Sequence, residues 1–158
     1  MPTVLMVCTG NICRSPMAAA LLRRRLEQDE ERSDWRVVSA GTWASEGRRA
    51  SGHAIEEMAS RGLDIGSHRS RSVDERLMEQ ADLVLVMTQN HAEALAATFP
   101  DRAEKVHLLS EMVGETYDIS DPYGGPRSEY ASVARELEGL IDRGYEQIVS
   151  LAEREASS

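Results

Sequence analysis

Aromatic residues are scarce in this chain of 158 residues, which contains one Phe, two Trp and four Tyr. Hydrophobic residues nevertheless make up 41% of the sequence, so the core must be built mainly from Leu, Val, Ile, Met and Ala. The length suits one domain with a sound core, and we expect residues 1–158 to form a single domain. No repeat or linker interrupts the sequence.

Cysteines and long apolar runs are also few. The chain has two cysteines, and no apolar run approaches the roughly 18 residues that a membrane-spanning helix needs. It shows no secretory signal segment either. These absences argue against a disulfide-rich secreted protein and against membrane insertion, and we expect a cytoplasmic protein in a reducing compartment.

Positive charge is in short supply, because 18 Lys and Arg residues face 27 Asp and Glu residues and give a formal net charge of −9 at pH 7. This balance argues against nucleic acid or an anionic membrane surface as the main partner. Residues 1–26 are the exception, since they contain no acidic residue and four arginines: Arg14, Arg23, Arg24 and Arg25. The potential that attracts anions is therefore concentrated near the start of the chain.

Within this basic region, an apolar run ends abruptly at a cysteine. Val4–Val7 is followed by Cys8, and Arg14 comes six residues later, before Ser15, Pro16 and a helical pattern. The pattern predicts a strand, a short loop and a helix. A loop that leads into a helix turns several backbone N–H groups toward one point, and the helix dipole adds positive potential there. We therefore expect phosphate or another oxyanion to bind in this loop.

The residue types in the loop suit phosphoryl chemistry. Arg14 can hold two phosphate oxygens with its planar fork. We expect Cys8 to be a thiolate that acts as a nucleophile, because amide donors and the guanidinium favour its charged form. Cys8 and Cys13 could instead be small core side chains in a plain turn, but Gly10 and Asn11 suit a tight loop. The predicted phosphate-binding residues are Thr9, Gly10, Asn11, Ile12, Cys13, Arg14 and Ser15.

Strand patterns alternate with helical patterns along the chain. Strands are predicted at Thr3–Val7, Trp35–Ser39, Leu83–Met87 and Val106–Leu109, and helices from Pro16 and at Gly52–Arg61, Asp74–Gln80, Asn90–Phe99 and Ser128–Arg154. Strands that are apolar on both faces are typical of parallel sheets covered by helices. We expect an α/β fold with three layers, in which helices cover both faces of a doubly wound, four-stranded parallel sheet. Ligands of such sheets bind at the carboxyl ends of the strands, where Cys8 lies.

A thiolate that attacks phosphorus must expel a leaving group, which needs a proton from a nearby carboxyl group. Asp121 is the best candidate because it lies in a loop stiffened by Pro122 and Pro126, and Asp118 is its rival. Asp-Pro also opens many ordinary turns, so the residues alone leave the role of Asp121 open. None of the four histidines has the spacing of metal ligands, and we expect no metal or other cofactor.

CTGNICRSPMA at Cys8–Ala18 resembles the signature of the low-molecular-weight protein tyrosine phosphatase family. The likeness continues through four further segments: SAGTW at Ser39–Trp43, SHRSR at Ser67–Arg71, ADLVLVM at Ala81–Met87 and DPYGG at Asp121–Gly125. It covers nearly the whole chain in order. The resemblance implies a metal-independent phosphatase that forms a cysteinyl-phosphate intermediate on Cys8 and acts on a phosphorylated protein.

The resemblance also implies roles for residues outside the loop. It selects Asp121 as the proton donor and places Tyr123 along the cleft. Trp43 could lie on the surface of the core or form a wall of the cleft, and the resemblance favours the wall. It further implies that His68 supports the phosphate loop through hydrogen bonds to the residues here numbered Asn11 and Ser15.

Cys13 has two interpretations. It could be a buried thiol beside the start of the helix. The resemblance favours a redox role, in which Cys13 forms a reversible disulfide with Cys8 after peroxide oxidises Cys8.

The nature of the phosphorylated side chain is the most open point. A branch of the family that removes phosphate from arginine resembles this chain in CTGN, in Met87-Thr88 and in the paired glycines after Tyr123, but carries threonine in place of Ile12. An isoleucine at this position is typical of the tyrosine phosphatases, because its apolar bulk lines the floor beneath an aromatic ring. Tyrosine phosphatases often have a second aromatic residue where this chain has Gly124. We favour phosphotyrosine, with phosphoarginine as the alternative.

Two other functions fit less well. Arsenate reductases on this scaffold use further cysteines, and this chain has none after Cys13. A non-catalytic module that binds oxyanions would lack Cys8, Arg14 or Asp121, and all three are present.

Overall fold

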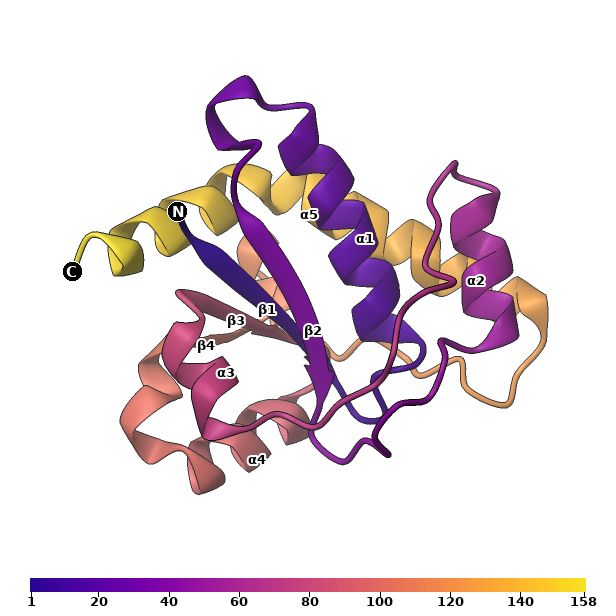
Figure 1. The fold of residues 1–158 in the computed structure, drawn as a ribbon, viewed down its shortest axis with the longest axis horizontal. Coiled ribbons are helices and arrows are strands. Elements are labelled where there is room, and N and C mark those ends of the chain that lie inside the picture. The colour runs from indigo at the N-terminus through magenta and orange to yellow at the C-terminus, as the bar shows by residue number, and fades with distance from the viewer.

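The computed structural model describes all 158 residues and contains a four-stranded, all-parallel sheet (Figure 1). The strands are β1 (Thr3–Cys8), β2 (Arg36–Gly41), β3 (Leu83–Val86) and β4 (Val106–Leu108), in the order β2-β1-β3-β4. The chain passes from β1 to one side at β2 and returns to the other side at β3. The direction of winding therefore reverses beside β1, which confirms the predicted doubly wound α/β fold.

Helices cover both faces of the sheet (Figure 1). They are α1 (Arg14–Glu27), α2 (Gly52–Ala59), α3 (Glu75–Gln80), α4 (Gln89–Thr98) and α5 (Arg127–Ala156), with short 3₁₀ helices at Glu30–Arg32, Pro100–Lys105 and Leu109–Val113. Side chains of β1 alternate between the faces. Val4 and Met6 join the larger core cluster with α1 and α5, whereas Leu5 and Val7 join the smaller cluster with α3 and α4. Burial on both faces explains why this strand is apolar throughout.

The observed elements begin and end within two residues of the predicted ones. The second strand runs to Gly41, two residues beyond its predicted end at Ser39, because the amide of Gly41 donates to the carbonyl of Arg71 and the chain bridges to Ser72. Thr88 caps α4, and its hydroxyl accepts a hydrogen bond from the amide of His91.

The carboxyl ends of the parallel strands meet at one edge of the sheet. Cys8 pairs there with Gly41, where a Cβ atom would overlap the carbonyl oxygen of Thr9. Glycine is therefore required for the close approach of β2 to the loop after β1. On the other side, the amide of Ile119 donates to the carbonyl of Met87. This bond fixes the loop that carries Asp121 at the end of β3.

None of the helices combines the length and the apolar character that crossing a membrane would require.

Candidate active site

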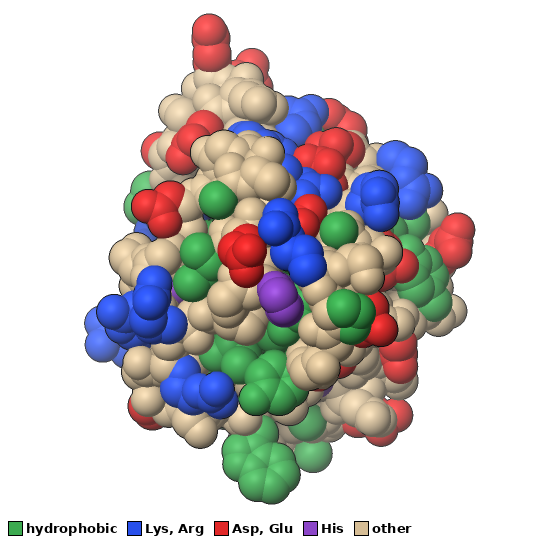
Figure 2. Space-filling view, turned by 90° about the vertical axis from the view of Figure 1, so that its right-hand side faces the viewer, with side chains coloured by type: hydrophobic (Ala, Val, Ile, Leu, Met, Phe, Trp, Pro, Cys, Tyr) green, Lys and Arg blue, Asp and Glu red, His purple; other side chains and the backbone are tan.

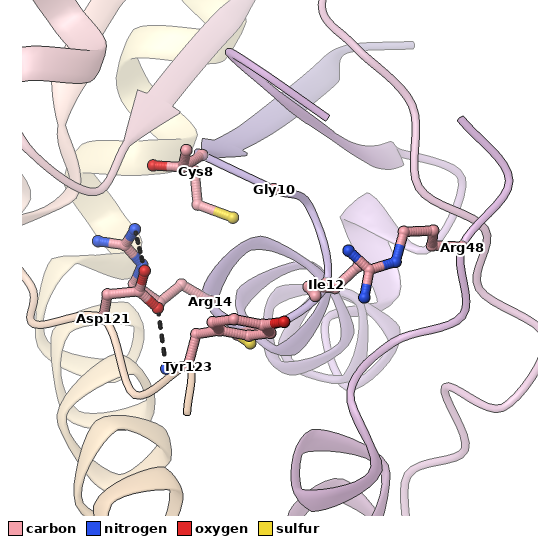
Figure 3. A pocket seen from close by; sticks show the side chains of 9 residues that line it. Cys8, Gly10, Ile12, Arg14, Arg48, Asp121 and Tyr123 are labelled. Carbon is pink, nitrogen blue, oxygen red and sulfur yellow. Dashed lines mark hydrogen bonds and ion pairs between the residues drawn. The ribbon is translucent and has the colours of Figure 1, made fainter. Parts of the chain in front are cut away.

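A pocket opens at the carboxyl end of β1 (Figure 3). Three segments that are far apart in the sequence line it. They contribute Cys8, Thr9, Gly10, Ile12, Cys13 and Arg14 from the loop after β1, Arg48 from the segment after β2, and Asp121 and Tyr123 from the loop before α5. The sequence analysis predicted all of these residues at the site except Arg48.

Asn11 sets the shape of the phosphate loop, residues 8–15. Its φ angle is +59°, a left-handed conformation that asparagine tolerates. Its side-chain amide donates to Ser15 Oγ at 2.8 Å and to Ser39 Oγ at 3.0 Å, and its Oδ1 accepts from the amide of Arg71 at 3.0 Å. Its backbone carbonyl accepts from His68 Nε2 at 2.7 Å. Asn11 is fully buried, so these bonds hold the loop from inside.

The backbone amides in the middle of the phosphate loop have no acceptor in the protein. None of the N–H groups of residues 9–13 donates a hydrogen bond to another group of the chain, although Asn11, Ile12 and Cys13 are buried. A buried N–H group without a partner is costly and rare in folded proteins. A run of them around one pocket is the arrangement that an oxyanion satisfies.

The sulfur of Cys8 lies in the pocket with two donors on it. Ser15 Oγ is 3.0 Å from Cys8 Sγ, and the amide of Ser15 donates to the same sulfur at 3.4 Å. Because Ser15 Oγ already accepts from Asn11, its own proton is free to point at the sulfur. Ser15 is therefore placed to stabilise negative charge on Cys8.

Arg14 places a buried guanidinium beside the loop. Its side chain is 4% exposed, and its Nη1 donates to the carbonyl of Ile119 at 2.8 Å. Its Nη2 lies 3.6 Å from Asp121 Oδ2. The Nε atom is buried and has no partner, so the guanidinium retains an unused donor for an oxyanion.

The structure separates the two candidate proton donors. Asp121 lines the pocket, its carboxyl group is half exposed, and its Oδ1 accepts from the amide of Tyr123 at 3.1 Å. Asp118 instead accepts from the amide of Gln89 at 2.8 Å, at the start of α4, and does not line the pocket. The position of Asp121 therefore fits a proton donor, whereas Asp118 serves as a helix cap.

Cys13 lies in a different environment from Cys8. Its Sγ is 3.5 Å from Ser51 Oγ and 3.4 Å from the hydroxyl of Tyr130. Burial raises the pKa of the Cys13 thiol, which outweighs the lowering effect of these two hydrogen bonds. Both cysteines are free thiols in this structure, and the redox role of Cys13 stays a prediction.

The contacts of two predicted residues differ from those expected. His68 contacts the phosphate loop through Asn11, as expected, but makes no hydrogen bond to Ser15. The Nε2 atom of His68 is instead paired with the carbonyl of Asn11, and the hydroxyl of Ser15 is paired with Asn11 and Cys8. Trp43 is 87% exposed and does not line the pocket. Only its backbone reaches the site, where its amide donates to the carbonyl of Thr9 at 3.0 Å.

Two residues at the site were missed by the sequence analysis. Arg48 lines the pocket, and its only sequence signal was a pair of arginines in an irregular segment.

His91 is buried behind the loop, with its Nε2 2.8 Å from Thr9 Oγ1. Since its Nδ1 accepts from the amide of Thr88 at 3.1 Å, the proton is on Nε2, which donates to Thr9. Burial, aided by the positive charge of Arg14, lowers the pKa of His91 to about 4, so the ring is neutral at pH 7.

No group of three or more His, Cys, Asp or Glu side chains in the structure is arranged to hold a metal ion. The arrangement at the pocket instead combines a nucleophilic sulfur, unpaired amides, a guanidinium and a carboxyl group, which together suit metal-independent phosphoryl transfer.

Comparison with known proteins agrees with this geometry. The family model described as low molecular weight phosphotyrosine protein phosphatase matches residues 3–153. A protein-arginine-phosphatase of Geobacillus stearothermophilus is 41% identical over 146 residues, which cover 92% of this chain and 95% of the relative. A probable low molecular weight protein-tyrosine-phosphatase, EpsP, of Ralstonia nicotianae is 41% identical over 142 residues, which cover 90% of each protein.

A solved structure shares the fold as well. It is a cysteine-to-serine mutant of YwlE arginine phosphatase with a phosphorylated active-site serine, and it superposes with a TM-score of 0.87 at 37% identity, covering 97% of this chain and 99% of its own. These likenesses extend over almost the full length of the sequence and include the loop that carries Cys8. The chain therefore belongs to the low molecular weight phosphotyrosine protein phosphatase family.

Proposed function

We propose that this chain hydrolyses phosphotyrosine in cytoplasmic phosphoproteins through a cysteinyl-phosphate intermediate. The observation that carries the proposal is the set of unpaired backbone amides around Cys8, together with the free donor of Arg14. A phosphoryl group supplies the acceptors that these donors lack.

In the first step, the sulfur of Cys8 attacks phosphorus, and the bond between phosphorus and the leaving oxygen breaks. The loop amides and Arg14 hold the three equatorial oxygens as charge develops on them. Asp121 transfers its proton to the leaving oxygen. The products are a cysteinyl phosphate and the dephosphorylated side chain of the substrate.

In the second step, water attacks phosphorus while Asp121, now a carboxylate, takes the proton of the water. The bond between phosphorus and sulfur breaks, and its electron pair returns to Cys8. Ser15 steadies the departing thiolate with the hydroxyl that lies 3.0 Å from the sulfur. Inorganic phosphate leaves, and all groups that the cycle requires belong to this chain.

The lining of the pocket supports phosphotyrosine over phosphoarginine. Ile12 contributes an apolar surface without a hydroxyl group, and the ring of Tyr123 stands at the mouth (Figure 3). Both suit the faces of a phenyl ring. Arg48 brings a positive charge to the same pocket, which opposes the positively charged guanidinium of phosphoarginine. The two relatives compared above are equally identical to this chain and carry different activities in their names, so identity alone does not separate the substrates.

The test compares kcat/KM for two peptides of one sequence, which carry either phosphotyrosine or phosphoarginine at the same position, in buffer with EDTA. We expect at least about tenfold preference for phosphotyrosine. Ile12→Thr should lower that preference, whereas Ile12→Val, which keeps the apolar surface, should retain it. A preference of the wild-type enzyme for phosphoarginine would overturn the assignment in favour of the alternative.

The proposed redox role of Cys13 has a separate test. After mild peroxide treatment, mass spectrometry of the unreduced protein should find a Cys8–Cys13 disulfide, and dithiothreitol should restore activity. Irreversible loss of activity with Cys13 still reduced would remove this role.

A further inference from the structure

Arg48 is the second cation of the catalytic pocket, and no step of the proposed reaction uses it. Figure 3 shows its guanidinium pointing toward the pocket, with Ile12 beside it and Tyr123 on the side toward Asp121. Arg14, the other cation, is buried and already contacts Ile119 and Asp121. Arg48 is exposed at the mouth, beyond the place where the phosphoryl group binds.

Ser70 holds the backbone of Arg48 through two hydrogen bonds, one to its amide and one to its carbonyl. Its amide donates to Ser70 Oγ at 2.9 Å, and its carbonyl accepts from the amide of Ser70 at 2.8 Å. Ser70 is 2% exposed, and its hydroxyl also donates to the carbonyl of Ser45. The segment that carries Arg48 is therefore fixed although it has no regular secondary structure.

The same short segment also holds the phosphate loop. His68 and Arg71, on either side of Ser70, bind the backbone carbonyl and the side chain of Asn11. The position of Arg48 relative to the loop of Cys8 is therefore set by residues 68–71. Because the backbone of Arg48 is fixed relative to Cys8, its guanidinium can contact a substrate side chain at a defined distance from the phosphate.

The guanidinium of Arg48 has no partner within the chain. All hydrogen bonds of this residue involve its backbone, and it belongs to no ion pair. Basic and acidic side chains are mixed over much of the face that carries α2, whereas groups of basic side chains lie beside an apolar patch near the bottom of that view (Figure 2). The chain as a whole carries a net charge of −9. The guanidinium of Arg48 is therefore unpaired at the mouth of the pocket and is available to a substrate.

We propose that Arg48 is a specificity residue that binds an acidic side chain of the substrate protein directly beside the phosphorylated residue. The inference rests on the proposed phosphotyrosine phosphatase function. It adds a preference for acidic residues beside the phosphotyrosine in the substrate protein. A guanidinium at the rim pairs with a carboxylate through a planar fork and repels a basic side chain. Because the pair is exposed, each acidic neighbour changes kcat/KM by only about two- to fivefold.

The test uses three phosphotyrosine peptides that differ only at the residues before and after the phosphotyrosine, which are Glu, Gln or Lys. The measured quantity is the ratio of kcat/KM between the Glu and Lys peptides, because a ratio within one enzyme cancels general losses of activity. The wild-type enzyme should favour the Glu peptide by about five- to tenfold at low salt. Arg48→Gln should bring the ratio close to one, and Arg48→Glu should invert it.

Arg49→Glu is the matched control, since it makes the same change of net charge one residue away and Arg49 does not line the pocket. It should keep most of the wild-type ratio. High salt should shrink the ratio in the wild-type enzyme, because exposed charges are screened. A wild-type ratio near one, or the same ratio in Arg48→Glu as in the wild type, would overturn the proposal.

If the phosphotyrosine assignment itself is wrong, the experiment gives a result that differs from failure of the Arg48 proposal. In that case the wild-type enzyme would hydrolyse phosphoarginine peptides better, and the same Glu-to-Lys ratio measured on phosphoarginine peptides would decide the role of Arg48 independently.

Discussion

The phosphate loop and the rim of the pocket differ in how their side chains are held. Within the loop, Asn11 and Ser15 are fully buried and hydrogen-bonded to each other. At the rim, Tyr123 is 60% exposed, and the guanidinium of Arg48 has no partner. The side chains that support the loop are immobilised, whereas these rim side chains are free to pair with a substrate protein. The internal support of the loop is thus separate from the contacts that the rim would make with the substrate protein.

The two regions are nevertheless joined through the backbone. The carbonyl of Thr9 accepts from the amide of Trp43, and residues 68–71 bind both Asn11 and Arg48. Rim side chains can therefore change without moving the loop, provided that the backbone stays in place. The predictions below test this separation, starting with the change that should have the largest effect.

Replacement of the proton donor should affect the chemical step most. Asp121→Asn removes the acid and the base of the proposed cycle and should lower kcat by about 10²- to 10³-fold, with a larger loss for poor leaving groups. Steady-state kinetics with a series of aryl phosphates measures this dependence. Asp118→Asn is the control, because Asp118 only caps α4. An equal or larger loss of kcat in Asp118→Asn would reverse the assignment.

Loss of the internal support of the loop should reduce both stability and activity. Asn11→Ala removes the side-chain hydrogen bonds to Ser15, Ser39 and Arg71 and puts alanine at a φ angle of +59°. We expect a loss of about 2–4 kcal/mol in the free energy of unfolding. Asn11→Gly removes the same bonds without the conformational strain. Urea denaturation of the two variants therefore separates the two contributions, and equal stability of Asn11→Ala and the wild type would contradict this account of the loop.

His91 should make the stability of the fold depend on pH. Its pKa falls from 6.5 to about 4 on folding, mainly through burial, so between these values the unfolded chain binds a proton that the folded chain does not. The stabilisation is full above pH 6.5 and is lost as the pH falls toward 4, by on the order of 3 kcal/mol. Urea unfolding of the wild type and His91→Asn at pH 5 and pH 7 should show a steeper loss in the wild type. Parallel losses would rule out this role.

Removal of the exposed ring should matter least. Trp43→Ala should change the free energy of unfolding by less than about 0.5 kcal/mol, because the ring is 87% exposed. Turnover of a small aryl phosphate should stay within about twofold of the wild type, since the backbone bond to Thr9 is retained. A tenfold loss with this small substrate would show that the ring contacts the reacting group after all.

The fold and the reactive residues of the phosphate loop were predictable because their signals are local, whereas Asp121 was selected only by the family resemblance. The strands show as apolar runs between turn residues, and the loop from Cys8 to Ser15 contains its nucleophile, its guanidinium and its left-handed residue within eight positions. Because these features depend on residues that are neighbours in the chain, a pattern in the sequence is enough to reveal them.

The remaining contacts depend on segments that meet only in the folded chain. Arg48 reaches the pocket because Ser70 holds its backbone, and His91 reaches Thr9 because α4 begins behind the loop. Neither contact has a periodic pattern or a spacing that reveals it. The expected bond from His68 to Ser15 is absent for a similar reason, since the folded chain brings His68 Nε2 to the backbone carbonyl of Asn11.

The most direct test of the account is the identity of the residue that receives the phosphoryl group. Asp121→Asn, which lacks the base for the second step, is mixed with an aryl phosphate in EDTA, quenched in acid and analysed by mass spectrometry of its peptides. The account predicts one added phosphoryl group on Cys8 and none in the Cys8→Ser, Asp121→Asn double variant under the same short exposure. Full turnover by Cys8→Ser, or a phosphoryl group attached elsewhere in the wild-type loop, would contradict it.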